Sequence, residues 1–263
     1  MRDTAVDVTP AIWGWAPLRR HVDADTSPAM ADTITYDLRD NIAQITLDDG
    51  KVNAMALPFF EGLGAAFDRA EKDGAKAVVI AGRAGFFSAG LNLKLLPTLP
   101  PDELKKSMLA FPRIMLRAFT LPIPTVAAVT GHAVAGGALL AFLCDLRFVA
   151  DGPFRIHMNE TAIGIPLPTW ILTVVQGAIA PRWQTEALLH ARAYTPAEAK
   201  ERGMITDVVP AEKVVETARA AAAQLTALDT RAYALSKQRL RAMIVRWAEE
   251  RVEQELVALP APR

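Results

Sequence analysis

Residues 131–145 read GHAVAGGALLAFLCD, with the paired glycines Gly136 and Gly137 at the head of an apolar run. No charged side chain follows Gly137 until Asp145, so the run predicts a buried helix. The preceding residues 125–131, TVAAVTG, are rich in β-branched types and predict a buried strand. Amides at the start of a helix lack intrahelical partners and lie at the positive end of its dipole. The stretch therefore predicts a backbone site for negatively charged oxygen.

Strands and helices alternate on both sides of this stretch. Residues 33–50 alternate apolar and polar side chains around a turn at 39–41, which predicts a β-hairpin. The spacing predicts a helix over 58–72, and the remaining patterns predict short strands over 75–82, 146–151 and 154–158.

Helices are expected to dominate the last third of the chain. Thr195 and Glu198 have the spacing of a capping box, which predicts a helix start. Residues 231–259 form a long amphipathic segment with an apolar stripe at Leu235, Leu240, Ile244 and Trp247. Such a stripe either joins the core or forms a subunit interface, and the pattern leaves both open.

Composition excludes several classes of partner. The 263 residues are 51% hydrophobic, enough for a large core, and they carry 29 basic and 29 acidic side chains. Without excess positive charge we expect neither nucleic acid nor a membrane surface as a partner, and no apolar run approaches the roughly 20 residues of a membrane helix. Cys144 is the only cysteine, which excludes an intrachain disulfide and a CxxC site and fits a reducing, cytoplasmic location.

The first 31 residues are interpreted as an N-terminal extension. They contain acidic side chains and no continuous apolar segment, which argues against a targeting peptide. Trp13 and Trp15 either anchor this extension on the body or on a neighbouring subunit, or lie in a loosely ordered tail.

Several common catalytic motifs are absent or incomplete. GLGAAF at 62–67 resembles a dinucleotide loop but lies inside a predicted helix. Ser88 lacks the preceding glycine of a nucleophile elbow, and no Walker loop is present. His157 and Glu160 form an H-x-x-E pair without a further histidine nearby, so no metal site is expected.

A second glycine segment remains, GFFSAGLNLKLL at 85–96. It also delivers glycine-flanked backbone to the predicted start of a helix. Two such segments together would supply the paired amides of an oxyanion hole. Each segment alone is also compatible with simple glycine-mediated packing.

The two segments resemble the crotonase (enoyl-CoA hydratase/isomerase) superfamily. FFSAGLNL at 86–93, KVNAM at 51–55 and the residues 127–151 carry the resemblance, which extends over about 33–250. It implies an α/β fold, a spiral of ββα units with a C-terminal helical region. We expect an N-terminal extension at 1–31, a core at 32–200 and helices at 201–263 that mediate a homotrimer or hexamer. The implied substrate is an acyl-CoA thioester, with no further cofactor.

The resemblance also implies the site residues. The amides of Ala89 and Gly136 match those that hold the thioester oxygen as it becomes an enolate. The substrate-binding positions are expected at Gly90, Leu91, Asn92, Gly137 and Leu139. Asn92 stands where many members have Asp, and either residue can cap a helix.

Only one of the two glutamates of the family's hydratases is present. Leu139 occupies the position of the first, and Glu160 matches the second. Water addition uses both carboxylates, whereas moving a double bond from C3=C4 to C2=C3 needs one base. Burial beside Leu139 and other apolar side chains would raise the pKa of Glu160 toward working pH.

A lone glutamate favours a Δ3,Δ2-enoyl-CoA isomerase. The alternatives are a hydratase, another CoA-thioester lyase or hydrolase, or a non-catalytic acyl-CoA binder. Prolines at 97, 100 and 101 predict that the helix breaks after Leu96. The segment that follows is expected to form a mobile cover over the acyl tail. Asp102 or Glu103 on that cover would be the route to a substitute acid.

Overall fold

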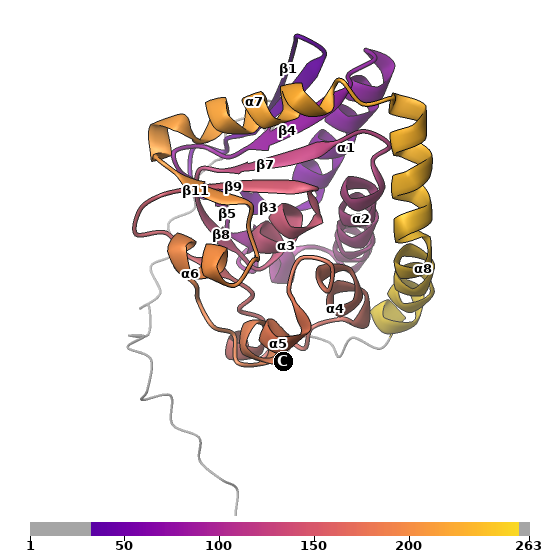
Figure 1. Cartoon of the computed structure of the whole chain (residues 1–263). Coiled ribbons are helices and arrows are strands. Elements are labelled where there is room, and N and C mark those ends of the chain that lie inside the picture. Colours follow the sequence, from indigo (N-terminus) through magenta and orange to yellow (C-terminus); the bar gives the residue numbers. More distant parts are fainter. Residues whose placement is uncertain (1–32, 258–263) are drawn as a thin grey trace, which may run out of the picture.

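A six-stranded sheet forms the centre of the molecule. The computed structural model describes residues 33–257, and its main sheet has the strand order β1-β2-β4-β7-β9-β11 (Figure 1). β1 pairs antiparallel with β2, and the remaining neighbours are parallel. The strands are β1 (Ile34–Arg39), β2 (Ile42–Leu47), β4 (Ala77–Ala81), β7 (Thr125–Val129), β9 (Leu146–Ala150) and β11 (Asp207–Val209).

The predicted hairpin is confirmed at the edge of this sheet. Ile34 pairs with Leu47 and Arg39 with Ile42, so a two-residue turn joins β1 and β2. Asp40 and Asn41 in that turn have φ of 55° and 62°. Positive φ at both central residues matches the right-handed twist of the flanking strands, and Asp and Asn tolerate it well.

A second, three-stranded sheet is built from strands that alternate along the chain with strands of the first. Its order is β10-β8-β5, all parallel, with β5 (Gly85–Ser88), β8 (Gly131–Val134) and β10 (Ile156–His157). Each of these strands follows a strand of the main sheet along the chain: β4 leads to β5, β7 to β8 and β9 to β10. Successive turns of the chain therefore stack in register. A two-stranded ladder joins β3 (Ala54–Met55) to β6 (Gly90–Leu91).

Helices cover both faces of the main sheet (Figure 1). Helix α7 lies on one face, and α1, α2 and α3 lie on the other. The helices are α1 (Leu57–Lys72), α2 (Pro101–Thr120), α3 (Gly136–Leu143), α4 (Thr169–Val175), α5 (Pro181–Gln184), α6 (Pro196–Glu201), α7 (Val214–Leu225) and α8 (Thr230–Val257). Short turns are η2 (Leu96–Thr98), η3 (Thr161–Ile163), η4 (Thr185–Leu189) and η5 (Ala211–Lys213).

The central strands are buried on both faces, which explains their continuous apolar sequences. In β4, Val79 packs into the cluster under α7, whereas Val78 and Ile80 pack into the cluster with α1 to α3. The predicted α/β class, the ββα repetition and the C-terminal helices are confirmed. The predicted capping box is present at the start of α6, where Thr195 and Glu198 bond reciprocally.

The predicted boundary at residue 200 lies inside the core. β11 joins the main sheet beside β9, and α7 covers that sheet. The sheet domain therefore continues to the end of α7, because a parallel edge strand can be contributed late in the chain. The predicted extension at 1–31, with Trp13 and Trp15, lies outside the described residues. None of the helices described in 33–257 combines the length and the hydropathy that a transmembrane span requires.

Candidate active site

The two glycine segments meet backbone to backbone. Gly90 has φ of +80°, and a Cβ built on it would lie 2.8 Å from the amide nitrogen of Gly136. A Cβ on Gly136 would lie 3.4 Å from the Cα of Gly90. Only glycine fits at position 90, for space and for torsion angle. Two segments far apart in the sequence thus form one backbone surface.

Gly137 is required for the same packing. Its missing Cβ would lie 2.1 Å from the carbonyl oxygen of Ser88, far inside contact distance. The start of α3 therefore packs directly on β5, the strand that begins the glycine segment 85–96. The expected close approach is present, and it is made to protein backbone.

Two buried polar side chains fix the glycine segment 85–96 in place. Asn53 donates from Nδ2 to the carbonyls of Leu47 at 2.8 Å and Phe87 at 3.1 Å. The hydroxyl of Ser88 donates to the Asn53 carbonyl at 2.6 Å. Sequence reasoning did not identify either residue as a support. The sequence feature that could have identified them is a polar residue within a mainly apolar stretch, in KVNAM and in FFSAG.

The predicted role of the Ala89 amide is wrong. That N–H donates to the carbonyl of Val52 at 3.0 Å, so it is not free to receive a substrate oxygen. The amide of Asn92 donates to Met55 at 2.8 Å in the β3·β6 ladder. Alternate amides of a strand face opposite sides, so the amide of Leu91 faces away from β3. Leu91, expected as a substrate-binding residue, therefore supplies the free N–H.

Gly136 supplies the second amide. It is the first residue of α3, where the N–H has no intrahelical acceptor. Apolar side chains lie close to Gly136: a Cβ on it would lie 3.1 Å from the Sδ of Met55 and 3.4 Å from a ring carbon of Phe111. An apolar environment strengthens the hydrogen bonds that such amides make.

Leu139 and Asn92 are structural in the free protein. Leu139, one turn along α3 from Gly136, is fully buried at 0% exposure. The Oδ1 of Asn92 accepts the amide of Leu95 at 3.0 Å and so caps the turn before η2, as expected of an Asp or Asn there.

Glu160 lies on the segment that follows the third strand of the small sheet. β10 pairs with β8, and the carbonyl of His157 accepts the amide of Ala135 at 2.7 Å. This contact brings the segment with Glu160 to the start of α3. Glu160 then precedes η3, and its loop ends at α4, where Glu255 accepts the amide of Thr169 at 2.7 Å.

One oxygen of the buried Glu160 carboxyl has no hydrogen-bond partner among the described residues. The residue is 8% exposed, and its Oε2 accepts no hydrogen bond from any described residue. Burial raises the pKa of Glu160 above its ordinary value, because desolvation disfavours the charged form. The predicted direction of this shift is confirmed. A buried carboxyl with one free oxygen and a raised pKa is suited to proton transfer.

Other titratable residues near the site have structural roles. Asp102 and Glu103 are exposed in the first turn of α2. His157 hydrogen-bonds through Nε2 to the Ala191 carbonyl at 2.6 Å, and the Nδ1 of His132 accepts the amide of Arg155 at 3.2 Å. Within 33–257, no three His, Cys, Asp or Glu side chains are grouped as a metal site requires.

Comparison with known proteins agrees with this geometry. The family model for enoyl-CoA hydratase/isomerase matches residues 37–260. The chain is 34% identical over 203 residues to human mitochondrial enoyl-CoA delta isomerase 1, covering 76% of this chain and 67% of that protein. The crystal structure of human mitochondrial delta3-delta2-enoyl-CoA isomerase superposes with a TM-score of 0.82 at 30% identity, over 86% of this chain and 91% of that one. An enoyl-CoA hydratase structure from Mycobacterium marinum gives a TM-score of 0.80 at 30% identity, over 86% and 98%. With its glycine segments and spiral of ββα units, the chain belongs to the enoyl-CoA hydratase/isomerase family of the crotonase superfamily.

Proposed function

We propose that the protein is an acyl-CoA-processing enzyme that moves a double bond from C3=C4 to C2=C3 of an enoyl-CoA thioester. The observation that carries this proposal is the buried carboxyl of Glu160, whose Oε2 has no partner among the described residues. Leu139 stands where the resemblance places a second acid. The substrate class follows from the names of the related proteins, among them human enoyl-CoA delta isomerase 1.

The reaction needs an oxyanion hole and one base. Glu160 takes a proton from C2 of the 3-enoyl thioester, and the electron pair moves onto the thioester oxygen. The amides of Leu91 and Gly136 hold that oxygen, each donor worth roughly 2.7 to 4 kcal/mol in related oxyanion holes. Glu160 then returns the proton to C4, the electron pair forms C2=C3, and the base is regenerated.

A single carboxylate suits this cycle because the same proton is removed and returned. Hydration would also require a group to activate water at C3. Asp102 and Glu103 are exposed in this structure, so neither is buried beside Glu160. We extend the proposal to a cytoplasmic homotrimer or hexamer that uses no cofactor beyond the coenzyme A of its substrate.

The test compares two substrates and two variants. Wild-type protein is incubated with a 3-enoyl-CoA and, separately, with a 2-enoyl-CoA, and bond migration and water addition are followed independently. We expect migration to dominate. Glu160→Gln should lower kcat for migration by about 10²- to 10⁴-fold, the usual contribution of a general acid–base group, with little change in binding of a saturated acyl-CoA. Glu201→Gln, at an exposed carboxylate, is the matched control.

Each contrary outcome identifies a different error. Water addition that outpaces migration would replace the isomerase with a hydratase. Unchanged migration in Glu160→Gln would remove Glu160 from the mechanism. Tight acyl-CoA binding without either reaction would indicate a non-catalytic binder.

A further inference from the structure

Ser107 carries a buried hydroxyl without a hydrogen-bond partner. The residue lies in the first half of α2 and is 1% exposed. Its Oγ contacts neither a donor nor an acceptor among the described residues. A buried hydroxyl that is left unpaired is costly, so its presence calls for a physical explanation.

The usual partner of a helical hydroxyl is available and unused. Thr120 in the same helix donates to the carbonyl of Leu116, four residues earlier, at 2.8 Å. Thr173 in α4 does the same with Thr169 at 2.8 Å. Ser107 makes no such bond, so its hydroxyl is not turned back onto its own helix.

The inner face of α2 borders the oxyanion hole. Phe111, one helical turn after Ser107, has a ring carbon 3.4 Å from the Cβ position of Gly136. Its ring also lies 5.5 Å from the ring of Trp170, which follows the Glu160 loop. Residues four apart lie on the same face of a helix, so Ser107 shares the inner face of α2 with Phe111, nearer the start of the helix. Lys106 and Ala110, in contrast, border a surface groove between α1 and α2.

We propose that Ser107 is a specificity-determining residue that hydrogen-bonds an oxygen substituent on the acyl chain. The proposal rests on the proposed function, since it assigns the acyl chain of the CoA substrate to this wall. A hydroxyl both donates and accepts, so it pairs with either a hydroxy or an oxo group. A plain alkyl chain leaves it unpaired, and a site with an unpaired polar group discriminates against such a ligand.

Binding of unreactive ligands tests this without turnover. The ligands are a saturated acyl-CoA and a panel of hydroxyacyl-CoA esters of equal length, with the hydroxyl moved along the chain from C4 to C8. Kd is measured by calorimetry for wild type, Ser107→Ala and Thr120→Ala. Thr120→Ala removes an exposed hydroxyl that already has a partner in the same helix, so it is the matched control.

We expect one position of the hydroxyl to bind wild type and Thr120→Ala about tenfold more tightly than the plain chain. Ser107→Ala should lose that preference and bind the plain chain as well or better. Its Tm should be unchanged or higher, because no hydrogen bond is lost.

Equal Kd values across the panel for wild type, or a preference that survives in Ser107→Ala, would overturn the assignment. Failure to isomerise a 3-enoyl-CoA, with the Ser107-dependent preference intact, would instead refute only the proposed reaction. Absence of acyl-CoA binding altogether would refute both.

Discussion

At the scale of single residues, the site combines fixed backbone donors with one movable proton. Only glycine fits at positions 90 and 137, because a Cβ there would lie 2.8 Å and 2.1 Å from neighbouring backbone atoms. The amides of Leu91 and Gly136 are held by these contacts and need no side-chain chemistry. Glu160 is the opposite case, because its side chain carries the proton and burial raises the pKa of its carboxyl.

The pH profile should report that carboxyl. Glu160 must be deprotonated to act as a base, and burial raises its pKa above the ordinary value of 4.5. We therefore expect kcat/KM for migration to fall on the acid side with a midpoint above 4.5. A pantetheine thioester is the better substrate, because a phosphate monoester titrates near pH 6 and would obscure the profile. A midpoint at or below 4.5 would contradict the assignment of Glu160 as the base.

Burial of the Glu160 carboxylate should lower the free energy of unfolding at neutral pH. A raised pKa in the folded state means that the stabilising contribution is present at low pH and is lost as pH rises through the folded pKa. Glu160→Gln carries no charge to desolvate, so its Tm should exceed that of wild type at pH 8, on the order of 2 °C, and converge with it in acid. A lower Tm for the variant at pH 8 would mean that the carboxylate is paired in solution.

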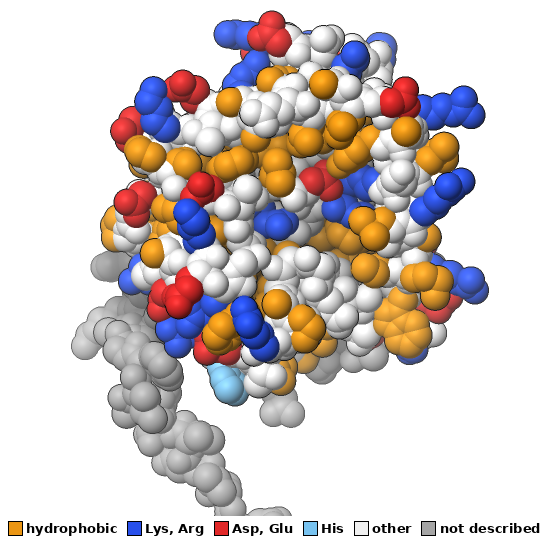
Figure 2. Space-filling view, viewed as in Figure 1, with side chains coloured by type: hydrophobic (Ala, Val, Ile, Leu, Met, Phe, Trp, Pro, Cys, Tyr) orange, Lys and Arg blue, Asp and Glu red, His pale blue; other side chains and the backbone are white. Residues whose placement is uncertain are grey.

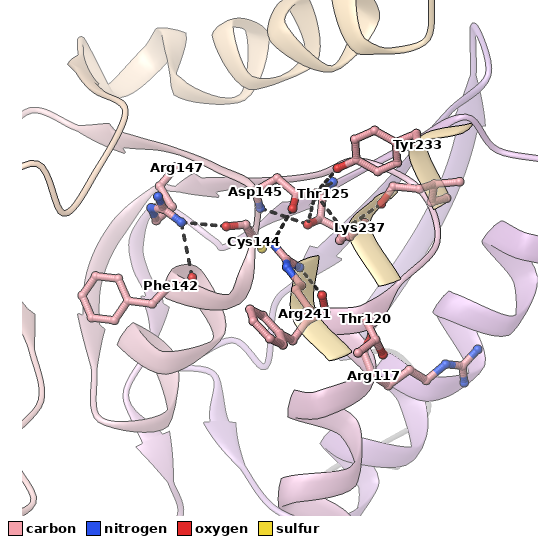
Figure 3. Close-up of polar contacts among 12 residues, drawn as sticks. Arg117, Thr120, Thr125, Phe142, Cys144, Asp145, Arg147, Tyr233, Lys237 and Arg241 are labelled. Atoms are coloured by element: carbon pink, nitrogen blue, oxygen red, sulfur yellow. Dashed lines mark hydrogen bonds and ion pairs between the residues drawn. The ribbon is translucent and has the colours of Figure 1, made fainter. Parts of the chain in front are cut away.

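At the scale of elements, a buried ion network docks α8 on the core (Figure 3). Asp145 follows α3, and its Oδ2 accepts hydrogen bonds from the Thr125 amide at 2.8 Å, the Tyr233 hydroxyl at 2.8 Å and the Lys237 Nζ at 2.7 Å. Its Oδ1 accepts from Arg241 at 2.6 Å. Tyr233, Lys237 and Arg241 all belong to α8. The network therefore fixes both the position and the rotation of the helix.

Asp145→Asn should loosen α8. The amide would leave the side chains of Lys237 and Arg241, 4% and 14% exposed, without a counter-charge. Breaking a buried pair from one side costs about 3–5 kcal/mol, and we expect that loss in the free energy of unfolding in urea at pH 7. Asp207→Asn removes the exposed partner of Lys200 and should change the same quantity by under about 1 kcal/mol.

At low pH the difference in free energy of unfolding between Asp145→Asn and wild type should disappear. Burial alone would raise the pKa of Asp145, but the charges of Lys237 and Arg241 outweigh it and hold that pKa below 3.8. Stability from a lowered carboxyl pKa is present above the unfolded pKa and lost as pH falls through the folded one. Equal stability of the two proteins at pH 7 would show that the network does not hold α8.

At the scale of the whole molecule, α8 presents an uncovered apolar face. Leu240 is 79% exposed, Met243 78% and Trp247 46%. Figure 2 shows hydrophobic side chains over the region of α8 at the right of the view. Ile244, predicted on the same stripe, packs instead against the core. Part of the stripe therefore joins the core, and the rest is exposed on the described surface.

Charge on this face should dissociate the assembly. Leu240→Asp combined with Met243→Asp should convert the expected trimer or hexamer to a monomer in light scattering, with the far-ultraviolet spectrum unchanged. Gln238→Asp introduces charge at an exposed polar position on another face of the same helix and should leave the mass unchanged. A monomeric wild-type protein, or an unchanged mass in the double variant, would contradict an interface here.

Local sequence patterns were enough to predict several of the elements and the two glycine segments. Turn residues, β-branched runs and helical spacing reflect interactions between residues close in the sequence. The hairpin, β4, β7, α1 and α3 can therefore be predicted without knowledge of the tertiary structure. The lone Glu160 and the loss of a second acid at Leu139 are likewise matters of residue identity, and the resemblance gave them their places.

Which backbone amides and side chains are free to bind a substrate depends on the tertiary structure. The register of β6 on β3 occupies the Asn92 amide and turns that of Leu91 outward, and Val52 occupies that of Ala89. Whether an amide is free depends on a partner more than 30 residues away, which no local pattern encodes. The unpaired hydroxyl of Ser107 and the network around Asp145 are decided in the same way, because burial and hydrogen bonding are properties of the packed chain.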